Sequence, residues 1–160
     1  MAETDPSGSC FCGLVRYRLT RPPMFVHCCH CRDCQKQTGS AFAINMLIER
    51  SCVALTDGSQ EPVLVTVKTD SGRPHDIYRC PQCQSALWSD YGRRGVLLFV
   101  RAATLDEGPG IVPDVHIFTR SKLPWLPLPP GARSFAEYYD MQKEWPRDSL
   151  ARRRAILGDG

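Results

Sequence analysis

Residues 10–12 read Cys-Phe-Cys and residues 80–83 read Cys-Pro-Gln-Cys, and these two stretches decide which fold we expect. Each pair can lie on a tight turn whose backbone N–H groups help to neutralise the two thiolates. Together the pairs supply four sulfurs to a tetrahedral zinc ion and leave no position for a substrate. Such a structural site would join the N-terminal region to the middle of the chain and contribute free energy of folding.

Cys80 and Cys83 have one alternative interpretation, as a redox-active pair. A Cys-x-x-Cys pair of that kind accompanies a thioredoxin-like βαβ pattern. The segments around residues 80–83 have the pattern of short strands instead, so we favour the metal site.

Composition and charge indicate a single cytosolic domain. The chain has 160 residues, of which 42% are hydrophobic, and its net charge is only +3. It has no basic face typical of nucleic-acid binding, no apolar run that could span a membrane and no apolar core of a secretory signal. We therefore expect no nucleic-acid partner, no membrane association and a cytoplasmic location. Because cytosolic thiols stay reduced, the nine cysteines are interpreted as metal ligands or reactive thiols rather than as disulfides.

Thirteen prolines and twelve glycines divide the chain into short segments, which favours a mainly β domain. Segments with the composition of strands occupy residues 14–19, 24–27, 41–48, 52–56, 63–69, 75–79, 86–88, 96–101 and 115–118. Their near-regular spacing predicts stacked antiparallel sheets.

Two helices are predicted near the C-terminus. Ser134-Phe-Ala-Glu137 has the pattern of a capping box, which begins a helix, and Pro146 suits the first position of a second helix that ends near Gly158. We divide the chain into a disordered leader at residues 1–8, a zinc-binding β domain at 9–139 and a helical tail at 140–160. The tail either packs on the β domain or joins a neighbouring subunit of a homo-oligomer.

A second group of candidate ligands occupies residues 27–34, which read His-Cys-Cys-His-Cys-Arg-Asp-Cys. Cys29, Cys31 and Cys34 can surround one metal ion from a single loop and leave a fourth position for water or a substrate, as in catalytic zinc sites. Sulfur ligands suit zinc better than magnesium or calcium. A thiol substrate could occupy the fourth position as a thiolate, because the metal lowers its pKa.

Two other states of this loop stay open. His27, Cys28 or His30 could complete a closed structural site, or the loop could hold no metal and oxidise to a disulfide. Alternating positions in such a loop point in opposite directions, so His30 is less suited to the metal bound by the three cysteines. His30 is our candidate for an acid–base group, and Cys28 and Cys52 are expected to be small buried residues.

Longer motifs surround these cysteines and extend along most of the chain. They are Gly-Ser-Cys-Phe-Cys-Gly-Leu-Val-Arg-Tyr at 8–17, Cys-His-Cys-Arg-Asp-Cys-Gln-Lys-Gln-Thr-Gly-Ser-Ala-Phe at 29–42 and Arg-Cys-Pro-Gln-Cys-Gln-Ser-Ala-Leu at 79–87, followed by Thr-Leu-Asp at 104–106, His-Ile at 116–117 and Trp125. In these motifs the chain resembles the glutathione-dependent formaldehyde-activating enzyme (GFA) family, which also includes centromere protein V.

The resemblance implies a β-tent of antiparallel sheets with two zinc ions. It assigns the structural zinc to Cys10, Cys12, Cys80 and Cys83, and the catalytic-type zinc to Cys29, Cys31 and Cys34. The activity that it implies is that of a carbon–sulfur lyase, which combines glutathione and formaldehyde to S-hydroxymethylglutathione or catalyses the reverse reaction. Gln84 departs from the family pattern, because it replaces a glycine common after the late Cys-x-x-Cys.

Two kinds of function follow from these predictions. The first is an enzyme that joins a glutathione-like thiol to a small aldehyde, with Arg32 and Lys36 as candidate contacts for the carboxylates of the thiol. A solvated surface role is the competing and favoured interpretation for each of these two side chains. The second is a non-catalytic zinc module that binds a thiol or a protein partner.

Overall fold

The computed structural model describes residues 5–158 and contains two compact units. Unit 1 comprises residues 1–23 and 47–111, and unit 2 comprises residues 24–46 and 112–160. The fold is mainly β, as the sequence predicted, with one antiparallel sheet, one mixed sheet and a C-terminal helix. Within residues 5–158, no helix has both the length and the apolar character needed to cross a membrane.

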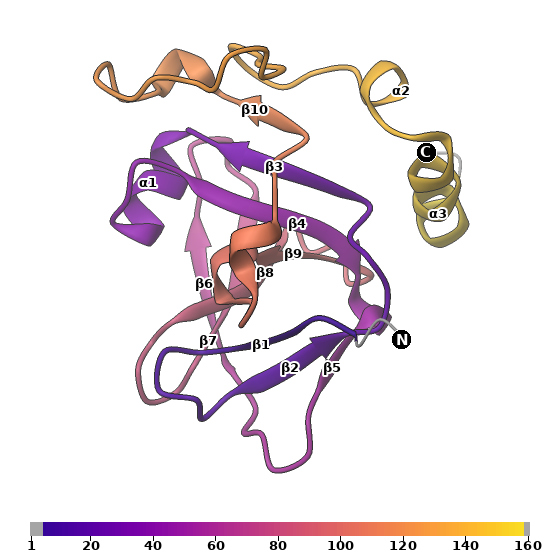
Figure 1. Ribbon diagram of the computed structural model, residues 1–160. Helices are drawn as coiled ribbons and strands as arrows, with labels where there is room; N and C mark the ends of the chain where they lie inside the picture. The colour runs from indigo at the N-terminus through magenta and orange to yellow at the C-terminus, as the bar shows by residue number, and fades with distance from the viewer. Residues whose placement is uncertain (1–4, 159–160) are drawn as a thin grey trace. The chain divides into compact units, whose positions relative to one another are not determined.

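Unit 1 is built from short antiparallel strands (Figure 1). They are β1 (Ser7–Ser9), β2 (Arg16–Leu19), β5 (Val53–Leu55), β6 (Val63–Lys68), β7 (Pro74–Arg79), β8 (Ala86–Tyr91) and β9 (Leu97–Arg101), with 3₁₀ helices at Arg50–Cys52, Ala102–Thr104 and Gly108–Gly110. β2 lies between β1 and β5, and β6 to β9 pair in chain order. In its core, the fully buried Tyr17 meets Trp88 edge to face.

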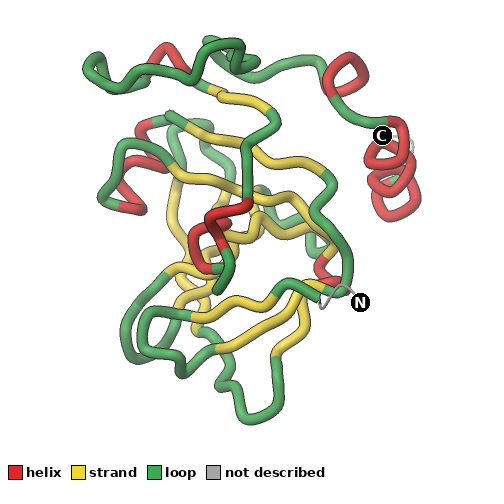
Figure 2. The backbone as a smooth tube through the Cα atoms, in the orientation of Figure 1, coloured by secondary structure: helices red, strands yellow, loops and turns green. Residues whose placement is uncertain are grey.

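Unit 2 contains β3 (Phe25–Cys29), α1 (Arg32–Thr38), β10 (Val115–Ile117), a 3₁₀ helix at Thr119–Ser121, α2 (Met141–Glu144) and α3 (Arg147–Leu157). β4 (Ala43–Glu49) begins in unit 2 and ends in unit 1. β10 pairs with β3 in the parallel direction. Much of the chain between β10 and α2 is loop (Figure 2).

The C-terminal tail packs on β3 of its own chain, which was one of the two predicted alternatives. The indole of Trp145 is buried and stacks on Phe25, with 5.2 Å between ring centroids. Its Nε1 donates a hydrogen bond to the hydroxyl of Tyr139 at 2.7 Å, and the hydroxyl of Ser149 donates to the carbonyl of Met24 at 2.6 Å. Aromatic burial and two polar contacts therefore hold the tail to unit 2.

All the predicted strands are present, with their ends shifted by a few residues, and the helix predicted after Pro146 is confirmed as α3 with Gly158 at its C-terminal cap. The helix predicted from Ser134 is wrong. The N–H of Phe135 donates to the carbonyl of His116 at 2.9 Å, and the N–H of His116 donates to the carbonyl of Arg133 at 2.8 Å. The carbonyls of Phe135 and Glu137, which a helix would need as acceptors, accept instead from the N–H groups of Thr119 at 3.1 Å and Phe118 at 3.0 Å.

Two further expectations differ from the structure. Of the predicted leader at residues 1–8, residues 1–4 lie outside the described residues, whereas Ser7 and Gly8 belong to β1, and the hydroxyls of Ser7 and Ser9 donate to the carboxylate of Asp106. The parallel pairing of β10 with β3 corrects the expectation that all strands pair antiparallel. The predicted division of the chain at residue 139 stays a prediction.

Candidate metal centres

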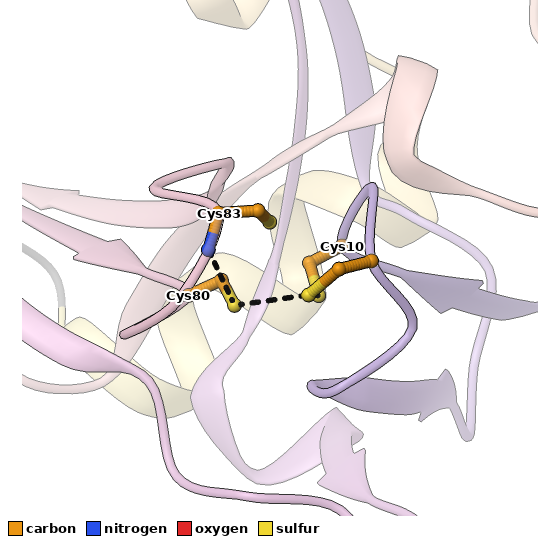
Figure 3. A group of neighbouring side chains, drawn as sticks. Cys10, Cys80 and Cys83 are labelled. Carbon is orange, nitrogen blue, oxygen red and sulfur yellow. Dashed lines mark hydrogen bonds between the residues drawn. The ribbon is translucent and has the colours of Figure 1, made fainter.

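Cys10, Cys12, Cys80 and Cys83 form the four-cysteine cluster of unit 1. Their sulfurs all lie within 4.8 Å of one another, with 3.6 Å between Cys10 and Cys12 and 3.7 Å between Cys12 and Cys80. Sulfurs bonded at about 2.3 Å to a tetrahedral zinc ion lie about 3.8 Å apart. Figure 3 shows the side chains of Cys10, Cys80 and Cys83 turned toward one shared space. The four sulfurs therefore fit a closed tetrahedral site.

Hydrogen bonds to these sulfurs favour thiolates, the form that binds zinc. The N–H of Val15 donates to Cys10 Sγ at 3.3 Å, and the N–H of Cys83 donates to Cys80 Sγ at 3.5 Å. A hydrogen bond of 3.2 Å joins Cys83 Sγ to the hydroxyl of Ser85 and lowers the pKa of Cys83 to about 5. The N–H groups of Val15 and Cys83 are turn donors of the kind that the Cys-x-Cys and Cys-x-x-Cys spacings predict.

Gln84 follows this cluster in the left-handed backbone region, with φ of 61°. Its N–H donates to the carbonyl of Cys80 at 3.1 Å, and its own carbonyl accepts from the guanidinium of Arg79 at 2.9 Å. These contacts hold a conformation that costs a residue with a Cβ roughly 1–2 kcal/mol. The strain explains in physical terms why a glycine suits this position.

We expect Gln84→Gly to raise the free energy of unfolding by about 0.5–1 kcal/mol, because relief of the strain exceeds the extra flexibility of the unfolded chain. Chemical denaturation of the metal-loaded protein measures the change. Gln84→Ala is the control, since it removes the same side chain and keeps the Cβ. Equal stability of the two variants would contradict the strain argument.

Cys29, Cys31 and Cys34 form the three-cysteine cluster of unit 2, with their sulfurs within 4.8 Å of one another. β3 ends at Cys29, Cys31 is the N-terminal cap of α1, and Cys34 lies in the first turn of that helix. The N–H of Cys34 donates to Cys31 Sγ at 3.4 Å. A strand end followed directly by a helix start thus brings three sulfurs from one loop together.

The electrostatics of this cluster favour a bound cation. Hydrogen bonding with Cys31 and Cys34, together with burial, raises the pKa of Cys29 far above its ordinary value, because adjacent thiolates repel one another. A divalent ion would compensate that repulsion. Among the described residues, no fourth cysteine, histidine or carboxylate belongs to the cluster. The donor set therefore fits zinc with three protein ligands.

His30 belongs to a different group of side chains. It is fully buried, and its Nε2 lies 3.0 Å from Nδ1 of His116 and 3.5 Å from Sγ of Cys28. This separation from the three sulfurs agrees with the alternation argument. The acid–base role of His30 stays a prediction. His116 was not predicted as a site residue, because only the fold brings it beside residues 28–30.

A pocket of about 370 Å³ lies beside α1 and is lined by Arg32, Gln35, Lys36, Gly39, Ser40, Ala41, Leu123 and Trp125. Arg32 and Lys36 stand one helical turn apart. Between them, Gln35 is buried, and its Nε2 donates to the carbonyls of His30 at 2.7 Å and Ser121 at 2.9 Å. Gln35 therefore anchors the helix that carries Arg32, Lys36 and Cys34 and that is capped by Cys31.

The chain is therefore a mainly β protein with two separate cysteine clusters, each able to hold a metal ion. The family model of the glutathione-dependent formaldehyde-activating enzyme (GFA) matches residues 5–121, and the chain belongs to this family.

Two known proteins are similar to the chain. A protein of Halomonas elongata, provisionally named a glutathione-dependent formaldehyde-activating enzyme, is 29% identical over 157 residues, covering 94% of this chain and 95% of that protein. The crystal structure of a Rhodobacter sphaeroides protein aligns with a TM-score of 0.45 and 21% identity, covering 67% of this chain and 91% of that one.

Proposed function

We propose that the protein is a zinc-dependent carbon–sulfur lyase that adds a glutathione-like thiol to a small aldehyde or catalyses the reverse reaction. The observation that carries this proposal is the three-cysteine cluster, which has no fourth protein ligand among the described residues and shares α1 with a pocket lined by the cationic side chains of Arg32 and Lys36. Family membership supports the same activity. In this proposal the four-cysteine cluster holds the structural zinc, and a cytoplasmic location keeps all the thiolates reduced.

The proposed reaction needs no oxidant or reductant. The S–H of the thiol adds across the carbonyl group of the aldehyde, so a C–S bond forms and the C=O π bond breaks. The thiol proton ends on the former carbonyl oxygen. Zinc held by Cys29, Cys31 and Cys34 would supply a Lewis acid that lowers the pKa of the thiol and binds its sulfur.

The residues of α1 supply binding and orientation in this proposal. The cationic side chains of Arg32 and Lys36 would bind carboxylates of a glutathione-like thiol. A thiol fixed in this way meets the aldehyde as a bound neighbour, which contributes much of the rate gain. His30 is the candidate for the group that moves the proton, and water is the alternative because His30 is fully buried.

We expect glutathione to shift the sulfur-to-metal charge-transfer bands of the cobalt-substituted protein, because its thiolate enters the coordination sphere of the three-cysteine cluster. S-methylglutathione is the matched control, since it keeps both carboxylates and has no free thiol, and it should leave the bands unchanged. Bleaching by glutathione would mean that the thiol removes the metal. Unchanged bands at millimolar glutathione would contradict the lyase proposal and favour the non-catalytic module.

The same titration measures the contribution of the pocket. Arg32→Ala should weaken glutathione binding by about tenfold, because a charge-assisted hydrogen bond contributes roughly 1.5–3 kcal/mol when desolvated and less at an open pocket. Lys68→Ala is the control, because Lys68 is an exposed cation on β6 in unit 1. Equal weakening by both substitutions would indicate long-range attraction rather than contact.

A further inference from the structure

Cys28, His30 and His116 bring three metal-ligand atoms together outside both cysteine clusters. Cys28 Sγ lies 3.5 Å from His30 Nε2, and His30 Nε2 lies 3.0 Å from His116 Nδ1. Ligands at the usual zinc distances, about 2.3 Å for sulfur and 2.0–2.1 Å for nitrogen, would stand about 3.6 Å and 3.3 Å apart at a tetrahedral ion. Two of the three separations thus lie close to those that one metal ion would impose, and the third, between the ligand atoms of Cys28 and His116, is within 4.8 Å.

The register of β10 against β3 assembles this group. His116 is the Cα partner of Cys28 in the parallel pair, so their side chains leave the sheet on the same face. His30 follows two positions after Cys28, and its N–H continues the pairing by donating to the carbonyl of Ile117 at 3.0 Å. Cys29, one position away, belongs to the other face and to the three-cysteine cluster. Successive residues at the end of β3 therefore point to opposite faces of the sheet, so that Cys28 and Cys29 belong to two different ligand groups.

Hydrogen bonds alone do not explain why these three ligand atoms lie so close together. A single nitrogen, His30 Nε2, contacts both the Cys28 sulfur and the His116 nitrogen, although it carries either one proton or one lone pair. All three side chains are buried, with exposed fractions of 2%, 0% and 9% for Cys28, His30 and His116. The one proton or lone pair of His30 Nε2 can therefore satisfy only one of its two buried neighbours, so this group requires an explanation.

We propose that Cys28, His30 and His116 form a third metal site, for a borderline divalent ion such as Zn²⁺. One thiolate and two imidazoles are ligands that zinc accepts, and a divalent ion would leave the buried site with a net charge of only +1. The metal would join β10 to β3 and hold the loop that carries the three-cysteine cluster. When this site is filled, His30 Nε2 is a ligand, and water rather than His30 moves the proton of the proposed reaction.

Substitution with ¹¹³Cd²⁺ tests the site directly, because the cadmium resonance depends on the number of sulfur ligands. At cadmium saturation we expect three resonances, from sets of four sulfurs, three sulfurs and one sulfur with two nitrogens. His116→Gln should abolish only the third. His75→Gln is the matched control, because His75 is a buried histidine of unit 1 that belongs to no ligand group in the described chain, and it should keep all three.

Two results would overturn the proposal: only two resonances in the saturated wild-type protein, or a third resonance that persists in His116→Gln. If His116→Gln fails to fold, Cys28→Ala removes the single sulfur of the site and must abolish the same resonance. Metal analysis of the zinc-saturated protein provides a second readout. Three zinc ions per chain in the wild type and two in either variant are expected, and two in all proteins would reject the third site.

Discussion

Cys80→Ser is expected to unfold unit 1 or to lower the melting temperature by more than about 10 °C, whereas Cys31→Ser is not. Cys80 is fully buried, and its sulfur lies 3.7 Å from that of Cys12, which comes from a distant part of the chain. A structural zinc site contributes about 10–16 kcal/mol in small metal-dependent domains, as much as the whole stability of a typical protein. Loss of one ligand there removes a link between distant segments.

Thermal unfolding followed by circular dichroism measures this difference. Cys52→Ser is the matched control, because Cys52 is a buried cysteine of the same unit that belongs to no ligand group in the described part of the chain. A strong chelator should lower the melting temperature of the wild type toward that of Cys80→Ser. Equal destabilisation by Cys80→Ser and Cys31→Ser would mean that the structural and catalytic-type sites have been assigned the wrong way round.

The second large effect concerns activity. We expect Cys31→Ser to lower the rate of thiol addition to formaldehyde by at least about 100-fold. Even residues that only hydrogen-bond to a metal ligand change metal affinity or activity by about 10–100-fold, and Cys31 would be a ligand itself. The fold should survive, because serine is itself a favoured N-terminal cap. The serine hydroxyl can accept the N–H of Cys34, which the sulfur of Cys31 accepts in the wild type. The substitution therefore separates metal binding from helix capping.

The rate of S-hydroxymethylglutathione formation at saturating zinc provides the measurement, with Cys52→Ser again as the control. Circular dichroism and the melting temperature verify that Cys31→Ser is folded. A folded Cys31→Ser protein that retains activity within about threefold of the wild type would rule out a catalytic role for the three-cysteine cluster, whatever the cluster binds.

The sequence predicted the two cysteine clusters because the spacing of cysteines within a single turn or loop determines how their sulfurs lie. A Cys-x-Cys or Cys-x-x-Cys spacing determines how two sulfurs leave a tight turn, and Cys29, Cys31 and Cys34 lie within one loop. The strands were also predictable, since alternating apolar residues between glycines and prolines need no knowledge of the rest of the chain. The left-handed φ of Gln84 was indicated only indirectly, by its departure from the family pattern.

Local patterns failed where distant backbone groups compete. Ser134-Phe-Ala-Glu137 has the residues of a capping box, yet the carbonyls of Phe135 and Glu137 accept from the N–H groups of Thr119 and Phe118 instead of from a following helical turn. Residues 1–8 were predicted to be a disordered leader, yet Ser7 and Gly8 pair with β2, and the hydroxyls of Ser7 and Ser9 donate to Asp106, which is about a hundred residues further along the chain. In both places the tertiary structure supplied hydrogen-bond partners that outweigh the local preference.

The closeness of the sulfurs within Cys10-x-Cys12, within Cys80-x-x-Cys83 and within Cys29–Cys34 was therefore indicated by the sequence alone, because each pair or triplet sets its own geometry within a few bonds. The group formed by Cys28, His30 and His116 was decided only by the tertiary structure. His30 and His116 are 86 positions apart, and nothing in the spacing of either residue indicates the other. They meet because β10 pairs with β3 in one parallel register, and a shift of that register by a single residue would turn His116 to the opposite face of the sheet.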